Sequence, residues 1–292
     1  MTKTVIITGA NSGLGFETTK QIVERGSEYQ LIMACRNMEK AQAAKEEILE
    51  QVPDANLVCL ALDTSSLAKV RAFVDQFKAL NVPLYGLVCN AGIAGRTVHK
   101  TDDGFSDIFE TNYLGHFLLT QLVLPLMADD GRIVTVSSER HDTPLKGVSW
   151  PGVNALAYGD PQVDSQSYPF SKLCMILFSY QLERELSASG KHIVVNTVNP
   201  GLMIETGLSK DKSRFTPEVV KQFADIIGTA KDSGKMITDL ICDDKFAQGP
   251  TKYFDRSSEK PVPSSNLSYD KQVQQELWNF SMKAVGLNKA SK

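Results

Sequence analysis

The sequence predicts an α/β fold in which helices cover both faces of a doubly wound parallel sheet. Two observations lead to this prediction. Short runs of Val, Ile and Leu alternate with helical patterns along the 292 residues, and the first run leads directly into a glycine-rich turn. Near-continuous apolar strands are typical of a parallel sheet, because both of its faces are buried. We therefore expect about seven strands in a three-layer α/β/α arrangement, formed by a single domain over residues 1–292.

Seven apolar runs have the length and composition of buried strands. These runs are Thr4–Thr8, Gln30–Cys35, Asn56–Leu62, Gly86–Asn90, Arg132–Ser137, His192–Val198 and the short Lys252–Phe254. Because helical patterns separate them, we expect the strands to lie parallel to one another.

Seven further segments have helical length and spacing. These segments are Phe16–Arg25, Met38–Gln51, Leu67–Ala79, Gly104–Met127, Tyr168–Ala188, Pro217–Gly228 and Tyr269–Val285. The start of one of them is well marked, since Thr216 can cap a helix and Pro217 suits its first position. The last segment carries one apolar face, which we expect to dock onto the core.

Two long connections interrupt this alternation, and we expect both to line a ligand site. They are Glu139–Gln166 and Leu202–Thr216, the second of which continues into the helix at Pro217. The candidate apolar contacts with a substrate in this part of the chain are Trp150, Val153, Leu156, Tyr158, Leu202, Met203 and Phe215.

Composition argues against several classes of function. A net charge of −3 without a Lys/Arg run offers no surface for nucleic acid. The apolar stretches are too short to span a bilayer, and a strand beginning at Thr4 leaves no room for a signal peptide or membrane anchor. The five cysteines form no Cys-x-x-Cys pair and the four histidines have no ligand spacing. We therefore expect a reduced cytoplasmic protein without a metal site, and treat the histidines as surface or packing residues.

The turn Thr8–Gly15 follows the apolar run Val5–Ile7 and precedes a predicted helix. Backbone N–H groups and the positive end of the helix dipole can bind a pyrophosphate at such a turn. Glycine permits the unusual dihedrals and the close approach of the ligand to the backbone. The spacing Gly-x-x-x-Gly-x-Gly differs from the common dinucleotide fingerprint. The turn therefore predicts a nucleotide site, while a glycine turn without a ligand remains the alternative.

Tyr168 and Lys172 lie four residues apart and share a helix face. An ammonium close to a phenol stabilises the phenolate and lowers the pKa of the phenol, which suits acid/base work on an alcohol or carbonyl oxygen. Ser137 or Ser138, at the end of the preceding strand, can bind the same oxygen, or can bond only to local backbone. Pro169 places the helix start at or just before Tyr168, and a displaced phenol would be poorly active.

Taken together, these residues resemble the short-chain dehydrogenase/reductase superfamily, whose Rossmann-type fold agrees with the predicted sheet. The motifs that carry the resemblance are Thr8–Gly15, Asp63, Asn90–Gly92, Asn112, Ser138, Tyr168 with Lys172, and Asn199–Gly201. They occur in the family's order and cover nearly the whole chain. The segments Met33–Asn37, Asn112–Phe117, Tyr168–Cys174, Glu276–Trp278 and Val285–Leu287 resemble the branch of retinol dehydrogenases and protochlorophyllide reductases.

The resemblance implies a role for each catalytic residue. Tyr168 is the proton donor or acceptor, and Lys172 lowers the pKa of Tyr168 and binds the nicotinamide ribose. Ser138 orients the substrate oxygen, and Asn112 holds a water of a proton relay.

The resemblance also implies how the cofactor is bound. Asp63 contacts adenine, Asn90 supports the sheet behind the cofactor, and Pro200, Gly201 and Thr206 flank the nicotinamide. The full implied cofactor set is Gly9, Asn11, Ser12, Gly13, Leu14, Gly15, Arg36, Asp63, Thr64, Asn90, Ala91, Gly92, Tyr168, Lys172, Pro200, Gly201 and Thr206.

Arg36 directs the choice of cofactor. An acidic residue at the end of the second strand binds a ribose 2′-hydroxyl and repels a 2′-phosphate. Here Cys35-Arg36 occupies this position, and a guanidinium can bind a phosphate through two hydrogen bonds. The sequence therefore predicts NADP(H), with a solvated surface arginine as the alternative.

The predicted function is hydride transfer between NADP(H) and the carbonyl or alcohol carbon of a small, fairly apolar substrate. One alternative is C=C reduction of the protochlorophyllide reductase type, which Cys174 favours; the interval between Ser138 and Tyr168, shorter than in those enzymes, disfavours it. Another alternative is a regulator that binds NADP(H) without catalysis. The helices Gly104–Met127 and Tyr168–Ala188 form the dimer surface in many relatives, so the resemblance also makes a homo-oligomer possible.

Overall fold

A parallel sheet of seven strands forms the centre of the molecule, with the strand order β3-β2-β1-β4-β5-β6-β7. The computed structural model describes residues 2–95, 97–142, 149–208, 215–224, 227–256, 258 and 260–287. The strands are β1 (Lys3–Thr8), β2 (Tyr29–Cys35), β3 (Asn56–Ala61), β4 (Leu84–Cys89), β5 (Met127–Val136), β6 (Val194–Asn199) and β7 (Lys252–Asp255). The predicted doubly wound α/β fold is confirmed.

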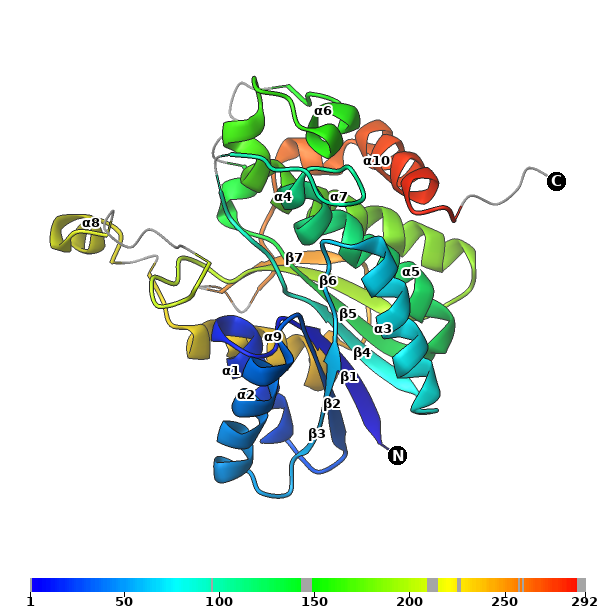
Figure 1. Cartoon of the computed structure of the whole chain (residues 1–292), viewed down its shortest axis with the longest axis vertical. Coiled ribbons are helices and arrows are strands. Elements are labelled where there is room, and N and C mark those ends of the chain that lie inside the picture. Colours follow the sequence, from blue (N-terminus) through cyan, green and yellow to red (C-terminus); the bar gives the residue numbers. More distant parts are fainter. Residues whose placement is uncertain are drawn as a thin grey trace.

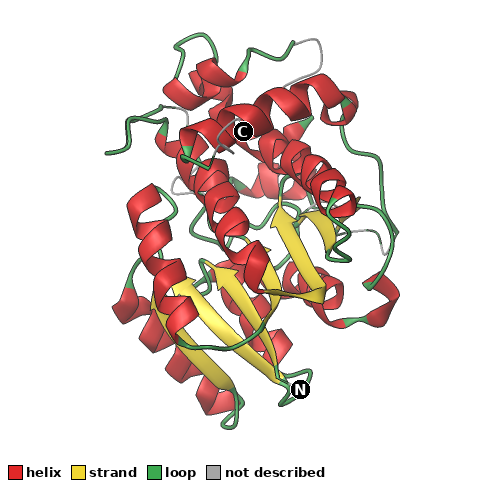
Figure 2. Ribbon diagram, turned by 90° about the vertical axis from the view of Figure 1, so that its right-hand side faces the viewer, coloured by secondary structure: helices red, strands yellow, loops and turns green. Residues whose placement is uncertain are grey.

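Helices cover both faces of this sheet (Figures 1 and 2). On one face lie α1 (Gly13–Val23), α2 (Met38–Gln51) and α9 (Ala230–Cys242), and on the other lie α3 (Leu67–Ala79), α5 (Gly115–Val123) and α7 (Ser167–Ala188). Alternate side chains of a strand point to opposite faces. Accordingly, Ile6 packs in the core under α3, α5 and α7, whereas Val5 and Ile7 pack under α1, α2 and α9.

Side-chain caps fix where several helices begin. Asn37 accepts a hydrogen bond from the backbone of Lys40 at the start of α2, and Ser66 does the same from Lys69 for α3. The predicted cap at Thr216 is confirmed, because its hydroxyl accepts from the backbone of Val219 in α8 (Pro217–Gln222). Each such bond satisfies a backbone donor that the first helical turn leaves unpaired.

Two helices differ from the sequence prediction. The segment predicted as the helix Gly104–Met127 comprises α4 (Asp107–Phe109), a π-helical turn (Glu110–Leu114), α5 and a 3₁₀ turn (Leu124–Leu126). Pro125 in the 3₁₀ turn lacks an N–H and cannot continue an α-helix, so β5 begins at Met127 instead of Arg132. The helix predicted to reach Gly228 ends at Gln222; residues 225 and 226 lie outside the described part of the chain.

Two helices were missing from the sequence prediction. One is α6 (Val153–Tyr158), within the connection Glu139–Gln166. The other is α9, whose apolar residues Met236, Ile237, Leu240 and Ile241 all face the core. Gly234 of α9 has a packing role, because a Cβ there would lie 3.2 Å from the Cβ of Glu17 and the backbone nitrogen of Thr18 in α1.

The last helix, α10 (Lys271–Ala284), docks onto the core as its apolar face predicts. The Trp278 ring lies 5.2 Å from the ring of Phe117 in α5 and 6.2 Å from that of Phe178 in α7, measured between centroids. Figure 1 shows α10 beside α7, on the side away from the sheet. The chain's own C-terminal helix therefore packs along α7 and reaches α5 through Trp278.

Candidate active site

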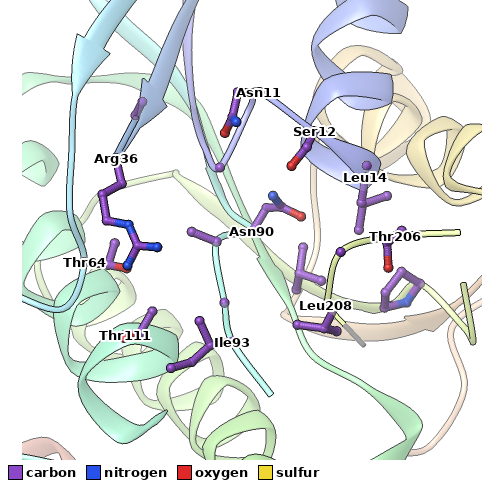
Figure 3. Close-up of a pocket in the computed structure, with 18 of the residues that line it drawn as sticks. Asn11, Ser12, Leu14, Arg36, Thr64, Asn90, Ile93, Thr111, Thr206 and Leu208 are labelled. Carbon is purple, nitrogen blue, oxygen red and sulfur yellow. The ribbon is translucent and has the colours of Figure 1, made fainter. Parts of the chain in front are cut away.

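A cleft of about 510 Å³ lies at the carboxyl ends of the strands. It forms where the strand order turns back, since the chain runs outward from β1 through β2 to β3 and in the opposite direction from β4 to β7. Ligands bind at such a switch point in open α/β sheets. Figure 3 shows Arg36 and Thr64 on one side of this cleft and Leu14, Thr206 and Leu208 on the other.

The glycine turn forms one wall of the cleft. Gly9 and Gly13 have φ angles of +69° and +52°, a conformation that side chains with a Cβ rarely adopt. The turn is pinned by a 2.8 Å hydrogen bond from the Gly9 N–H to the Ala34 carbonyl. Helix α1 begins at Gly13, and its N-cap Ser12 makes no side-chain capping bond to the described residues. The first N–H groups of α1 are therefore placed to bind an anion.

Two glycines of the predicted cofactor set do not line the cleft. A Cβ on Gly15 would lie 2.3 Å from the Gly9 carbonyl oxygen and 2.8 Å from Asn90 Nδ2, so this glycine lets the turn pack closely on α1. Gly201 has a φ of +76°, and its N–H donates to the Asn199 side chain at 3.0 Å. Both positions support the turns that carry the lining residues, such as Gly9 and Pro200.

Asn90 and Thr8 hold the floor of the cleft in place. The Asn90 side chain donates to the Thr8 carbonyl at 2.8 Å, and the N–H groups of Asn90 and Ala91 both donate to the Thr8 hydroxyl at 2.9 Å. These bonds connect the ends of β1 and β4 directly behind the glycine turn. Ala91 and Gly92 follow and line the cleft.

The far end of the cleft carries positive charge. Arg36, Asp63 and Thr64 line it as expected, and Lys40 does so as well. Sequence reasoning missed Lys40, although it follows Arg36 by four residues. The Asp63 carboxylate accepts from the Ser65 hydroxyl at 2.6 Å and from Lys69 Nζ at 3.1 Å. Burial acts to raise the pKa of Asp63, but these partners outweigh it and lower that pKa.

Tyr168 and Lys172 line the opposite end of the cleft, on the first two turns of α7. The helix begins at Ser167, so Pro169 falls in the first turn, where a proline nitrogen is tolerated. The predicted helix start is confirmed. Lys172 Nζ lies 5.8 Å from the centre of the Tyr168 ring and donates to the Val136 carbonyl at 3.0 Å.

The pKa of Tyr168 shifts opposite to the predicted direction. Burial raises it to about 12, outweighing the hydrogen bond to Ser138 and the charge of Arg140, which both lower it. Burial also lowers the pKa of Lys172 to about 8. The expectation of an acidified phenol is therefore wrong for this structure, because burial acts on both groups and the ammonium is directed to the Val136 carbonyl.

The geometry distinguishes the two candidate serines. The Ser137 hydroxyl is buried and donates to the Lys172 carbonyl at 2.8 Å, so it ties β5 to α7. Ser138 is half-buried and lies close enough to the Tyr168 side chain to act on the pKa of the phenol, which it lowers. Its hydroxyl also accepts from the Arg140 backbone at 3.2 Å. Ser138 is therefore the serine beside the phenol, although Ser137 rather than Ser138 lines the cleft described above.

Asn112 lies in the π-helical turn and is buried. Its side chain accepts from the Ile93 N–H at 2.8 Å, and donates to the Ile93 carbonyl and to the Ser171 hydroxyl, both at 2.9 Å. The Ser171 hydroxyl in turn donates to the Tyr168 carbonyl at 2.7 Å. The Asn112 side chain therefore holds the loop after β4 against the start of α7 and does not line the cleft.

Thr206 reaches the glycine turn from the connection after β6. A Cβ on Gly13 would lie 3.3 Å from Thr206 Cγ2, so glycine allows this close approach. The preceding turn is anchored by the Ser233 hydroxyl of α9, which donates to the Pro200 carbonyl at 2.6 Å. Pro200 and Thr206 both line the cleft, as predicted, between the glycine turn and Tyr168.

Comparison with known proteins agrees with this arrangement. The family model described as short chain dehydrogenase matches residues 3–150, which contain the glycine turn, Asn112 and Ser138. The chain belongs to the short-chain dehydrogenase family. Members of this family are oxidoreductases that bind a nicotinamide cofactor.

Curated relatives and solved structures extend this similarity over the whole chain. Short-chain dehydrogenase TIC 32 B, chloroplastic, of Brassica napus is 37% identical over 291 residues, covering 97% of this chain and 88% of the relative. Polyprenol dehydrogenase of Homo sapiens is 31% identical over 291 residues, covering 98% and 86%. A solved structure of an uncharacterized protein from Mycobacterium Paratuberculosis has a TM-score of 0.72 at 29% identity, covering 97% of this chain and 93% of that one.

The cleft of this short-chain dehydrogenase fits a dinucleotide. The glycine turn and the start of α1 offer backbone N–H groups for a pyrophosphate, and Asp63 and Thr64 lie at one end with Tyr168 and Lys172 at the other. Several lining residues were not predicted, namely Ala34, Lys40, Leu62, Ile93, Thr111, Val136, Gly207 and Leu208. Most of them are apolar or small, so the sequence distinguishes them poorly from core residues.

Proposed function

We propose that this protein transfers a hydride between NADP(H) and the carbonyl or alcohol carbon of a small, fairly apolar substrate. The observation that carries the proposal is the position of Tyr168, Lys172 and Ser138 at one end of the cleft, with the glycine turn along its wall. When bound, the cofactor supplies the hydride. The protein supplies alignment and a proton at the substrate oxygen.

Tyr168 is the residue that handles this proton. A phenol whose pKa is raised to about 12 keeps its proton at neutral pH, so it can donate to a carbonyl oxygen as that oxygen gains charge. Ser138, which lies beside Tyr168, offers its hydroxyl to the same oxygen. Lys172 lies one helical turn further and also lines the cleft, and we propose that it binds the nicotinamide ribose, as the resemblance implies.

NADP(H) is proposed over NAD(H) because of the two cations at the far end. Arg36 and Lys40 both line the cleft and are exposed, so each can reach a 2′-phosphate. A guanidinium forms paired hydrogen bonds with a phosphate, and an ammonium adds a second positive charge. The acidic residue at this end, Asp63, is engaged by Ser65 and Lys69.

An apolar substrate agrees with the described lining on the catalytic side. Ile93, Met203 and Leu208 contribute apolar surface there. The human relative at 31% identity is named for a polyprenol, which is also an apolar alcohol. Two residues expected to contact a substrate, Val153 and Leu156, are instead buried in the core, and Tyr158 stacks on Phe105 with ring centres 5.5 Å apart.

The alternatives are less well supported. Cys174, which favoured C=C reduction, is fully buried in the core, where burial raises the pKa of its thiol. It does not belong to the residues that line the cleft. A non-catalytic regulator has no need of Tyr168, Lys172 and Ser138, all of which are present at one end of the site.

We propose a cytoplasmic location, which remains a prediction. All five cysteines are free thiols. Among the described residues, no helix combines the length and the apolarity needed to cross a membrane. The Brassica napus relative carries the word chloroplastic in its name, so fractionation of the source cells is the test that distinguishes the two compartments.

The activity is tested with the purified full-length chain, NADPH and a panel of ketones and aldehydes of increasing apolarity. We expect loss of the absorbance of the reduced cofactor with at least one apolar carbonyl, and a slower rate with NADH. Tight NADPH binding without turnover of any panel member would instead support the regulator.

A further inference from the structure

Two of the four histidines are buried beside the catalytic end of the cleft. His116 and His141 have 0% and 3% of their surface exposed, whereas His99 and His192 are exposed. Each buried ring bonds to the backbone carbonyl of a residue in the predicted catalytic set. The sequence showed only that these histidines lack metal-ligand spacing, and the function proposed above assigns them no role.

The hydrogen bonds of His116 fix its proton on Nδ1. Nδ1 lies 3.1 Å from the Asn112 carbonyl, which can only accept, so Nδ1 must carry the hydrogen. Nε2 lies 2.9 Å from the Thr8 hydroxyl, whose two lone pairs already accept from the N–H groups of Asn90 and Ala91. The Thr8 hydroxyl can donate to Nε2 or to the Val88 carbonyl at 3.3 Å, and Nε2 is bare in the neutral ring because Nδ1 carries the hydrogen. The ring connects the glycine turn to the π-helical turn through a directed chain of hydrogen bonds.

His141 has the same tautomer for an independent reason. Its Nδ1 lies 2.7 Å from the Ser138 carbonyl, so Nδ1 donates. Its Nε2 accepts from the Ser265 backbone N–H at 3.0 Å, which requires a bare nitrogen. The ring also packs on Tyr253 of β7, with centroids 5.0 Å apart. His141 therefore joins the backbone of Ser138 to the C-terminal segment that follows β7.

We infer that His116 and His141 are positioning residues, which as neutral Nδ1–H tautomers hold the backbones of Asn112 and Ser138 in their working places. The consequence for turnover rests on the proposed function, but the hydrogen bonding does not. A shift of Ser138 would move its hydroxyl away from Tyr168. A shift of Asn112 would break its hydrogen bonds to Ile93, in the loop after β4, and to Ser171, in the first turns of α7.

The surroundings of both rings favour the neutral form. Burial lowers the pKa of His116 to about 4, and the charge of Lys172 lowers it further. The hydrogen bond to the Asn112 carbonyl raises this pKa but is outweighed. Burial also lowers the pKa of His141. The Ser138 carbonyl and the Asp142 carboxylate raise this pKa but are outweighed. The titratable side chains that face the rings are Lys172 for His116, and Asp142 and Tyr253 for His141. A second proton on His141 would lie on Nε2, where it would point at the Ser265 N–H and break that hydrogen bond.

The tautomers are tested by nitrogen-15 NMR of the histidine rings in the full-length chain, which needs no turnover. With signals assigned through His99→Gln and His192→Gln, we expect both buried rings to be protonated on Nδ1 and bare on Nε2 at pH 7. Nε2-protonated or charged rings at His116 and His141 would overturn the inference, whether or not the protein is found to be a reductase.

The positioning role is tested by steady-state kinetics with NADPH and a carbonyl from the panel. His141→Asn keeps a donor near Nδ1, whereas His141→Leu fills the space without one. Because small misplacements of catalytic groups are costly, we expect kcat to fall roughly 10- to 100-fold in the Leu variant, with the KM for NADPH nearly unchanged and with Asn restoring most of the loss. Equal kcat values in the two variants would show that His141 only packs. If the Leu variant fails to fold, the kcat of His141→Asn relative to the wild type and the nitrogen-15 spectra of the rings still test the positioning role.

Discussion

At the scale of single residues, burial determines the chemistry of the site more than pairwise charge does. Tyr168 and Lys172 are one helical turn apart, yet burial raises the pKa of the phenol and lowers that of the amine. The Tyr-x-x-x-Lys spacing predicted the pair, but not that Lys172 would bond to the Val136 carbonyl. A sequence shows which groups share a helix face, and not how much water surrounds them.

Arg36 and Lys40 determine cofactor preference in this account. Replacing both with Ala should raise the KM for NADPH roughly 10- to 100-fold and leave the KM for NADH almost unchanged, because only the 2′-phosphate contacts are lost. Initial rates at varied cofactor concentration measure this. Lys78→Ala, an exposed lysine on α3, is the control. Equal losses with both cofactors would contradict the assignment.

Glu110 gives a prediction about stability and pH. Burial first, and the nearby charges of Asp103 and Asp63, raise the pKa of Glu110 from 4.5 to about 8. The folded protein therefore retains a proton that the unfolded chain releases, and this carboxyl reduces stability as the pH rises from about 4.5 to about 8. At pH 8, Glu110→Gln should raise the free energy of unfolding by roughly 2 to 4 kcal/mol.

Urea unfolding of wild type and Glu110→Gln at pH 5 and pH 8 measures this difference. The gain should be much smaller at pH 5, where the folded wild type carries the same proton. Glu47→Gln, at an exposed position on α2, is the matched control and should show no such pH dependence. A gain that is equal at the two pH values would point to packing instead of ionisation.

At the scale of elements, prediction succeeded where a strand or helix has its own signal. The apolar runs of β1, β2 and β4 and the cap at Thr216 were visible in the sequence. The π-helical turn around Asn112 was not, because tertiary contacts of Asn112 with Ile93 and Ser171 hold it. Helix α9 was missed although Thr229 caps it and its apolar residues are well spaced.

The candidate site, like the fold, was predicted from the sequence only in part. The glycine turn, Arg36, Tyr168 and Lys172 were predicted from residue type and position, and all line the cleft. The choice between Ser137 and Ser138 needed coordinates, because both follow β5 and only three-dimensional contacts separate the one bonded to Lys172 from the one beside Tyr168. The histidines carried no recognisable spacing, so their contacts were also invisible in the sequence.

Helix α10 should stabilise the fold strongly through Trp278. This side chain is 9% exposed and packs on Phe117 and Phe178. Trp278→Ala should lower the free energy of unfolding by roughly 3 to 5 kcal/mol, as buried aromatic truncations do. Phe223→Ala, at a side chain 39% exposed after α8, should cost less than roughly 1 kcal/mol. Urea unfolding monitored by circular dichroism compares them, and similar losses would contradict the packing role of α10.

At the scale of the whole molecule, the C-terminal part of the chain occupies surfaces that could otherwise pair with a second copy. Helix α10 packs along α7 and reaches Phe117 of α5 through Trp278, and α5 and α7 lie in the segments that form the dimer surface in many relatives according to the resemblance. Beside the sheet edge, the Val262 N–H donates to the Tyr253 carbonyl of β7. Helix α8, in contrast, projects from the body and has no buried residue (Figure 1).

We therefore propose a monomer, although the resemblance makes a homo-oligomer possible. Light scattering on the eluting peak of a size-exclusion column should give about 32.1 kDa, the mass of one chain. The reason is that Trp278 of α10 already packs on Phe117 of α5 and Phe178 of α7 within the same chain. A stable mass of twice this value, unchanged on dilution, would refute the proposal.

Tyr168→Phe shows whether the Tyr168 hydroxyl delivers the proton to the substrate oxygen. With NADPH and the best carbonyl of the panel, we expect kcat to fall by roughly 10²- to 10⁴-fold, the usual contribution of a general acid, while NADPH binding, followed by fluorescence, stays unchanged. A Phe variant that binds NADPH normally and turns over at the rate of the wild type would show that another group supplies the proton.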